Sequence, residues 1–136
     1  QFVNPWGVGV GPGGHVWVAD PNNHRVQVLT KEGQYVRTLG VTRQFGRGNH
    51  QFSHPKGVCV EPGPRGRVFV ADTSNHRVQV LKKDGTHLRT IGVAGQPGNG
   101  IHQFCAPYAV AVEPGPDGLL LYVADTDNNR VHVFLK

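Results

Sequence analysis

The sequence lacks methionine and contains only two cysteines, Cys59 and Cys105. Their spacing fits neither a disulfide framework nor a zinc site, so both are interpreted as small residues of the scaffold. The longest apolar run, Leu119–Ala124, is far too short to span a bilayer. No basic-then-apolar signal peptide opens the sequence, which favours an intracellular protein. Because the chain starts at Gln1 rather than at a methionine, we expect that a preceding segment has been lost or left out.

A sustained helical period is also missing. The apolar runs are four to six residues long, rich in valine and bounded by turns, as expected of short β-strands. The 19 glycines and 10 prolines fit many tight turns. Acidic residues are scarcer than basic ones, 9 against 14, which gives a net charge of +5. Such a charge favours acidic partners, nucleic acid among them, but only as a long-range field.

One phrase of eleven residues recurs three times in this sequence. It reads ADPNNHRVQVL at 19–29, ADTSNHRVQVL at 71–81 and ADTDNNRVHVF at 124–134. A second phrase, Gln-Phe-x-x-Pro, recurs in step with it and starts at Gln1, Gln51 and Gln103. The sequence therefore divides into three repeats, at 1–50, 51–102 and 103–136.

Each full repeat predicts four short antiparallel strands joined by turns. A period of this length with four strands is typical of a β-propeller blade, so the fold class is all-β with about three blades. The third repeat stops at Lys136 after its third strand and lacks the outermost one. Propellers close with about four to eight blades. We therefore expect a partial propeller whose remaining blades come from a longer chain or from a second copy.

The recurring phrase also predicts how the second and third strands of each blade pair. Aspartate and arginine lie opposite each other at its two ends, in the pairs Asp20–Arg25, Asp72–Arg77 and Asp125–Arg130. Three such aspartates resemble a metal ring or a catalytic set. However, each one has its own arginine, which neutralises the charge that a metal requires, so we interpret the pairs as structural.

The residues between each aspartate and arginine are expected to form a tight loop. The aspartate is expected to cap amides of this loop as an Asx turn. Asn23, Asn75 and Asn128 within this loop tolerate left-handed backbone conformations. Side chains alternate between the two faces of a strand, so both faces of a blade are apolar. On the outer faces of the end blades we expect Trp17, Val26, Tyr122 and Val133.

The segment from Gln51 to Gly92 resembles the NHL repeat. The matching elements are the Pro-x-Gly-Val strand, the core ADTSNHRVQV and the Gly turn in KKDG, and they recur along nearly the whole chain. The connections 40–50 and 92–102 are longer than is usual in that family. The resemblance implies a propeller of six blades that binds protein or single-stranded RNA. A minority of related proteins, including a peptide-amidating lyase, are metal-dependent enzymes.

The connection between the first two repeats departs most from the others. Between Leu39 and Val60 there is no acidic residue, and the candidate binding residues there are Arg43, Phe45, Arg47, His50, His54 and Lys56. Cations interleaved with an aromatic ring suit single-stranded RNA, through phosphate contacts and base stacking. The same segment also suits a plain connection or a docking surface for a protein. The equivalent segment 92–108 has no charged residue.

An enzyme reading finds little support in the sequence. His50 and His54 have the H-x-x-x-H spacing of zinc helices, but the segment is Gly-rich and Gln51 replaces the required glutamate. No nucleophile elbow or phosphate-binding loop is present. We therefore assign no catalytic residue, metal ligand or cofactor. The predicted function is a non-catalytic scaffold for protein partners. The alternatives are single-stranded RNA binding through residues 40–56, or a metal-dependent lyase- or hydrolase-like enzyme completed by absent blades.

Overall fold

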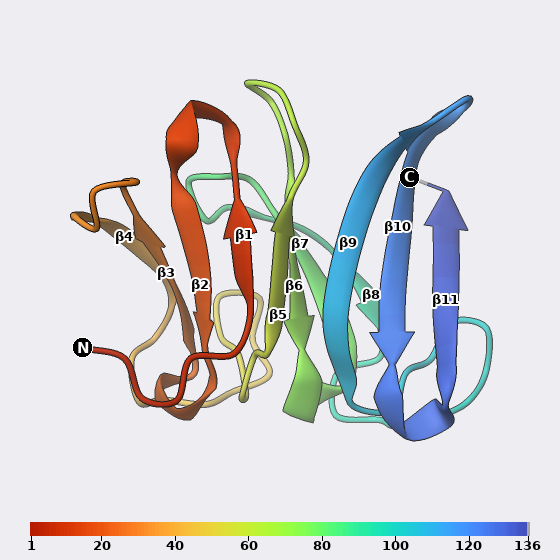
Figure 1. Ribbon diagram of the computed structural model, residues 1–136. Helices are drawn as coiled ribbons and strands as arrows, with labels where there is room; N and C mark the ends of the chain where they lie inside the picture. Colours follow the sequence, from red (N-terminus) through yellow and green to blue (C-terminus); the bar gives the residue numbers. More distant parts are fainter. Residues whose placement is uncertain (136) are drawn as a thin grey trace.

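The chain folds into three antiparallel sheets that stand side by side (Figure 1). The structure is a computed structural model that describes residues 1–135, so Lys136 of the third predicted repeat lies outside the described residues. We call the sheets blades 1, 2 and 3 in chain order. Blades 1 and 2 have four strands each, and blade 3 has three. The described residues form no α-helix, hence none long and apolar enough to cross a membrane. The all-β partial propeller expected from the sequence is confirmed.

The strands follow one another within each blade as a simple meander. Blade 1 contains β1 (Val8–Val10), β2 (Val16–Asp20), β3 (Arg25–Leu29) and β4 (Tyr35–Gly40). Blade 2 contains β5 (Gly57–Val60), β6 (Val68–Asp72), β7 (Arg77–Leu81) and β8 (His87–Gly92). Blade 3 contains β9 (Pro107–Gly115), β10 (Gly118–Asp125) and β11 (Arg130–Leu135). The strands β1, β5 and β9 are the inner strands, and they lie next to one another across the blades.

The predicted strand register is confirmed in the central hairpin of blade 2. Asp72 pairs with Arg77 at the end of the hairpin, and Phe69 pairs with Val80 on the face opposite to that of Asp72. Val70 pairs with Gln79 on the other face. A slip of one residue would exchange the two faces, so this register decides which side chains reach each neighbouring blade.

The hydrophobic core consists of two layers, one in each space between adjacent blades. The first layer joins blade 1 to blade 2 and contains Trp17, Ala19, Val26, Val28, Leu39, Phe52, Val58, Val60, Val68, Val70 and Leu81. The second joins blade 2 to blade 3 and contains Phe69, Val78, Val80, Ile91, Phe104, Leu119, Leu121 and Val123. Each fully buried large apolar side chain stabilises the fold by about 1.5–3 kcal/mol. Blade 2 is apolar on both faces, since blade 1 covers one face and blade 3 covers the other.

Glycine lets the inner strands approach one another closely. A β-carbon on Gly57 would lie 2.6 Å from the carbonyl oxygen of Tyr108 on β9. A β-carbon on Gly7 would lie 2.3 Å from the carbonyl oxygen of Lys56. No real β-carbon fits at such distances from backbone atoms, so the glycine after Pro-x in the first two repeats is required by packing.

The outer faces of the end blades differ in part from the sequence prediction. Val133 is exposed on blade 3, as expected, together with Val131. Trp17 and Val26 are buried instead, because that face of blade 1 packs on blade 2. The exposed valines of blade 1 are Val8 and Val10, on the opposite face and along the inner strand.

The tight loops within the recurring phrase also differ from the prediction. Each loop is a single 3-10 turn, at Pro21–Asn23, Thr73–Asn75 and Thr126–Asn128. The preceding aspartate makes no side-chain cap to its turn, so the Asx expectation is wrong. The left-handed residues are His24, His76 and Asn129, each directly after the asparagine that the sequence interpretation had named as tolerant of that conformation.

Candidate binding surface on the first rim

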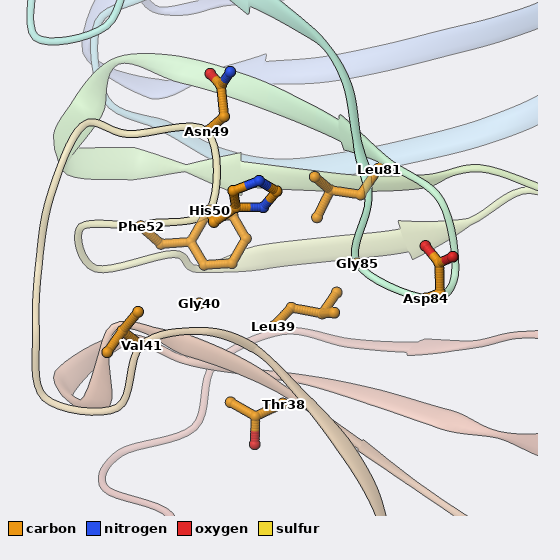
Figure 2. Close-up of a pocket in the computed structure, with 10 residues that line it drawn as sticks. All are labelled: Thr38, Leu39, Gly40, Val41, Asn49, His50, Phe52, Leu81, Asp84 and Gly85. Carbon is orange, nitrogen blue, oxygen red and sulfur yellow. The ribbon is translucent and has the colours of Figure 1, made fainter.

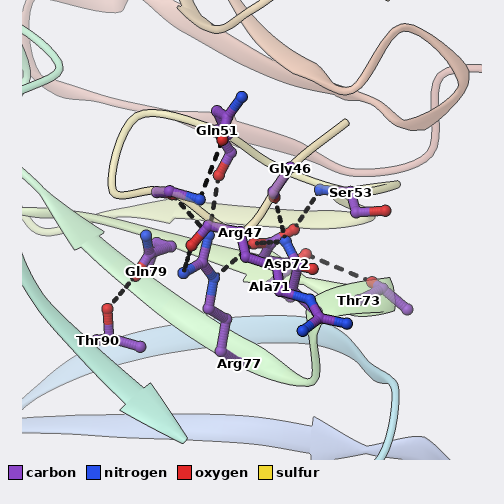
Figure 3. Close-up of polar contacts among 12 residues, drawn as sticks. Gly46, Arg47, Gln51, Ser53, Ala71, Asp72, Thr73, Arg77, Gln79 and Thr90 are labelled. Carbon is purple, nitrogen blue, oxygen red and sulfur yellow. Dashed lines mark hydrogen bonds and ion pairs between the residues drawn. The ribbon is translucent and has the colours of Figure 1, made fainter. Parts of the chain in front are cut away.

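The 3-10 turns of the recurring phrase and the connections between blades lie on one edge of the molecule, at the bottom of Figure 1, whereas the 3-10 turn Pro12–Gly14 lies in the β1–β2 hairpin at the opposite edge. We call this edge the first rim, and the edge formed by the other hairpin turns the second rim. In blade 2, Asp72, Asn75 and Arg77 form a hydrogen-bonded group on the first rim that we call the clasp, and Figure 3 shows its Asp72 and Arg77 side chains. Arg77 Nε donates to Asp72 Oδ2 at 2.7 Å, and Asn75 Nδ2 donates to the same oxygen at 2.9 Å.

The clasp holds the connection that leads into blade 2. The two terminal nitrogens of Arg77 donate to the carbonyl oxygens of Arg47 (2.9 Å), Gly48 (2.9 Å) and Gln51 (3.0 Å). Asp72 Oδ1 accepts from the Ser53 amide at 2.7 Å. A buried carboxylate with these donors has all the partners that its charge needs. The ion pair therefore has a second role, which is to fix the backbone of the connection.

The same clasp recurs in blades 1 and 3. Arg25 lies 2.9 Å from Asp20, and Arg130 lies 2.8 Å from Asp125. Arg130 also donates to carbonyl oxygens of the second connection, as Arg77 does to the first. Burial raises the pKa of Asp72, and the Ser53 amide, Arg77 and Asn75 oppose that rise. The repetition indicates a structural device present in every blade.

Arg43 is exposed on the first connection in a strained backbone conformation. Its φ is +63°, in the left-handed region that disfavours a residue with a β-carbon. Its amide donates to the Asn23 carbonyl, just as the amide of Gly95 donates to Asn75 in the second connection. Glycine occupies this position in the second connection, with φ +72°. The first connection thus places an arginine where the backbone favours glycine.

Phe45 is the first of three aromatic rings that contact one another in a row, followed by His24 and His54. Its side chain is 70% exposed, and its ring centre lies 5.6 Å from that of His24. The His24 ring in turn lies 4.4 Å from the His54 ring, nearly edge to face. His24 Nδ1 accepts a hydrogen bond from the His54 amide at 3.1 Å. Burial lowers the pKa of His24, and the neighbouring His54 lowers it further.

Lys56 lies between two aromatic rings where the inner strands begin. Its Nζ is 4.3 Å from the centre of the Trp6 ring and 4.0 Å from that of Tyr108. The two rings meet edge to face at 5.6 Å. Two pockets, of about 280 and about 300 Å³, flank this cluster, and His54 lines the smaller one together with Lys56. We call the set Trp6, Phe45, His54, Lys56 and Tyr108 the first-rim patch.

The structure separates two of the sequence candidates from this patch. Arg47 lies with its guanidinium against Gly95 of the second connection. His50 lines a different pocket of about 220 Å³ between blades 1 and 2, near Leu81 and Asp84 (Figure 2). The six candidates therefore form no single cluster.

The patch also includes residues that the sequence interpretation missed. Trp6 and Tyr108 come from other repeats and were not among the candidates. They occupy the same position as Lys56, directly after the proline of each Gln-Phe-x-x-Pro phrase. Aligning the three repeats column by column would have found them, because equivalent positions of neighbouring blades come together at the inner strands.

Among residues 1–135, no three His, Cys, Asp or Glu side chains are grouped so that they could hold a metal ion. Cys59 is partly buried and packs against the second core layer, where burial raises the pKa of its thiol to about 12.

Comparison with known proteins identifies the family to which these repeats belong. The sequence profile of the NHL repeat matches residues 2–29 and 52–81, the first three strands of blades 1 and 2. The chain belongs to the NHL-repeat family. Mouse NHL repeat-containing protein 3 is 32% identical over 136 residues, which cover 99% of this chain and 36% of that protein. Drosophila melanogaster Protein brain tumor is 30% identical over 92 residues, or 68% of this chain and 9% of that protein. This NHL chain thus spans about a third or less of the curated relatives it matches.

Solved structures share the fold of this NHL chain at low sequence identity. An auxiliary nutrient binding protein from Bacteroides thetaiotaomicron superposes with a TM-score of 0.72 at 13% identity, over 93% of this chain and 36% of that one. Virginiamycin B lyase from Staphylococcus aureus superposes with a TM-score of 0.56 at 16% identity, over 100% of this chain and 42% of that one. At such identities the likeness concerns the propeller fold and carries no activity over to this chain.

Proposed function

We propose that this NHL chain is a non-catalytic interaction scaffold that binds a protein partner through the first-rim patch. The observation that carries this proposal is the exposure of two large aromatic side chains on that rim. Trp6 is 54% exposed and Phe45 is 70% exposed. Tryptophan and other aromatic residues with nearby cations are the side chains that contribute most to protein–protein binding.

Neighbouring residues hold both exposed rings in fixed positions, which favours binding of a partner. Trp6 is held against Tyr108 and Lys56, so its ring loses little conformational freedom on binding. Phe45 rests against His24 on a connection whose backbone is held by the clasp of Arg77. Rigid aromatic anchors of this kind bind with a small entropic cost.

The test compares variants of the full-length protein in co-purification and in binding to the partner so identified. Trp6→Ala and Phe45→Ala should each weaken that binding by about 2 kcal/mol, about thirtyfold. Ile101→Ala is the matched control, because Ile101 is 75% exposed on the second connection, outside the patch. Its affinity should match that of the unaltered protein.

Two results would refute the proposal. One is a partner that binds Trp6→Ala and Phe45→Ala as tightly as the unaltered protein. The other is an equal loss for Ile101→Ala, which would mean that general surface hydrophobicity causes the binding. Thermal unfolding of each variant separates loss of the fold from loss of the contact.

Single-stranded RNA is the second candidate ligand, and the strained Arg43 favours it. A cation retained at an unfavourable backbone position, two residues from an exposed ring, suits phosphate contact beside base stacking. If Arg43 and Lys56 contact phosphates, replacing both with alanine should reduce the log–log salt slope by about 1.4. Phe45→Ala should weaken RNA binding by about 1–3 kcal/mol without changing that slope. If the full-length protein has no affinity for RNA at low salt, this candidate is eliminated.

A further inference from the structure

The second rim of blade 2 contains a pocket of about 550 Å³ that the first-rim function does not use. It lies between the turn joining β5 to β6 and the turn joining β7 to β8. Its lining residues are Pro64, Arg65, Gly66, Arg67, Lys82, Lys83, Asp84 and Leu88. Four of these are cationic and one is acidic, so the lining has a formal charge of +3.

Two of the four cations are accounted for by the fold. Arg67 Nε donates to Glu61 at 2.8 Å, and the Arg67 guanidinium lies over the ring of Phe69. Lys83 Nζ donates to the Gly63 carbonyl at 2.6 Å, which ties the two turns together. These contacts fix the walls of the pocket.

The other two cations have no such role. Arg65 and Lys82 are both exposed, and neither forms an ion pair within residues 1–135. The one carboxylate in the lining, Asp84, is engaged with its own turn, where the Thr86 amide donates to it at 2.9 Å. The hydrogen bonds from Thr86 lower the pKa of Asp84, and the nearby charges of Lys82 and Arg37 lower it further without forming an ion pair.

The corresponding turns of the other two blades, as far as residues 1–135 contain them, carry neither of these two charges. Blade 1 has Thr30 at the position of Lys82, and its shorter turn has no counterpart of Arg65. Blade 3 has Asp117 at the position of Arg65. The propeller blade therefore does not require Arg65 or Lys82, and their chemistry is a property of this pocket.

We propose that this pocket binds an acidic peptide segment of a partner protein. Arg65 and Lys82 would face its carboxylates, and the exposed side chain of Leu88 would contact an apolar residue between them. Charge complementarity selects the ligand, since the two cations without an ion pair, Arg65 and Lys82, attract carboxylates and repel basic segments. The apolar Leu88 and Pro64 favour a peptide with a hydrophobic residue within an acidic run.

Fluorescence anisotropy of the full-length protein tests this site with a labelled peptide of four glutamates around one leucine. Arg65→Glu and Lys82→Glu should each weaken binding about tenfold, because each replaces an attraction by a repulsion. Leu88→Ala should weaken it less. Binding should weaken as the salt concentration rises. The control Lys31→Glu makes the same charge change at the equivalent of Lys83 in blade 1, outside the pocket, and should bind the peptide normally.

Four outcomes would overturn the assignment. The peptide could fail to bind at low salt, or bind equally to Arg65→Glu and to the unaltered protein. Lys31→Glu could weaken binding as much as the pocket variants, which would reduce the effect to net charge. A single-stranded RNA could bind in place of the peptide with the same sensitivity to Arg65→Glu, which would assign the pocket to nucleic acid. The first-rim variants Trp6→Ala and Phe45→Ala leave this pocket intact, so either site can fail without the other.

Discussion

The two connections between blades have the same backbone contacts and different side-chain chemistry. In the first, the Gly46 amide donates to the Phe52 carbonyl, and in the second the Gly98 amide donates to the Phe104 carbonyl. Both are held by an arginine of the blade that follows. The cations and the aromatic ring of the first connection are missing from the second, where Arg43, Phe45 and Arg47 correspond to Gly95, Pro97 and Asn99. The clasp fixes the backbone, which leaves these side chains free to differ in function.

The largest expected effect comes from breaking the clasp itself. Arg77→Ala should destabilise the protein by about 3–5 kcal/mol, because it leaves the buried Asp72 uncompensated and three carbonyl oxygens without their donor. Arg130→Ala should cost less, since the Arg130 side chain is 28% exposed against 2% for Arg77. Urea unfolding of both variants measures the difference.

Equal losses in the two variants would contradict this comparison. They would mean that the contacts to the connection, which both arginines share, matter more than burial of the ion pair. A conservative control, Arg77→Lys, keeps the charge but loses the planar guanidinium, so it should still be destabilised.

The clasp also shows which structural features could be predicted from the sequence and which could not. Periodicity and the repeated phrase predicted the strands, their register and the Asp72–Arg77 pairing, because side chains alternate strictly along a strand. Nothing local in the phrase indicates that Arg77 also reaches residues 47–51, about thirty positions earlier in the chain. That contact depends on where the connection runs in space.

The prediction that Trp17 lies on an outer face was wrong for a related reason. Alternation separates the two faces of a blade, but it does not say which face meets the following blade. Trp17 and Phe69 share one repeat position, and both face the next blade in the chain. The equivalent face of blade 3 is therefore the one left uncovered. For the same reason, the sequence of one repeat alone could not predict that Trp6, Lys56 and Tyr108 lie close together, because each comes from a different blade.

A smaller effect is expected from making the first connection resemble the second at one position. Arg43→Gly should stabilise the protein by about 1 kcal/mol, because glycine adopts the left-handed conformation at φ +63° without the cost of a β-carbon. If Arg43 contacts RNA phosphates, the gain should be accompanied by weaker binding of single-stranded RNA. Thermal unfolding and binding measured on the same sample test both. Gly95→Ala is the reverse change and should destabilise, because it introduces that strain and places a β-carbon against Arg47.

The smallest effect concerns a histidine that each connection contacts in the same way. His24 Nδ1 accepts from the His54 amide at 3.1 Å, and His76 Nδ1 accepts from the Ala106 amide at 3.0 Å. Protonation of His24 at Nδ1 would place an N–H against the His54 N–H and break that bond. Only in the first connection does a second histidine ring lie against the acceptor, and there burial and His54 lower the pKa of His24 below 6.5.

The sign of the pH dependence follows from that lowered pKa. On acidification the unfolded chain binds a proton at His24 before the folded chain does, so stability falls as the pH drops through about 6.5. His24→Asn should make urea midpoints between pH 7.5 and pH 5 less dependent on pH, with a change of about 0.5–1 kcal/mol. Asparagine is tolerated there, since Asn129 holds the same left-handed position in blade 3. His76→Asn removes the matching bond away from His54 and is the control. If His24→Asn leaves the pH dependence of the urea midpoint unchanged, the pKa of His24 is the same in the folded and in the unfolded chain, and the prediction is wrong.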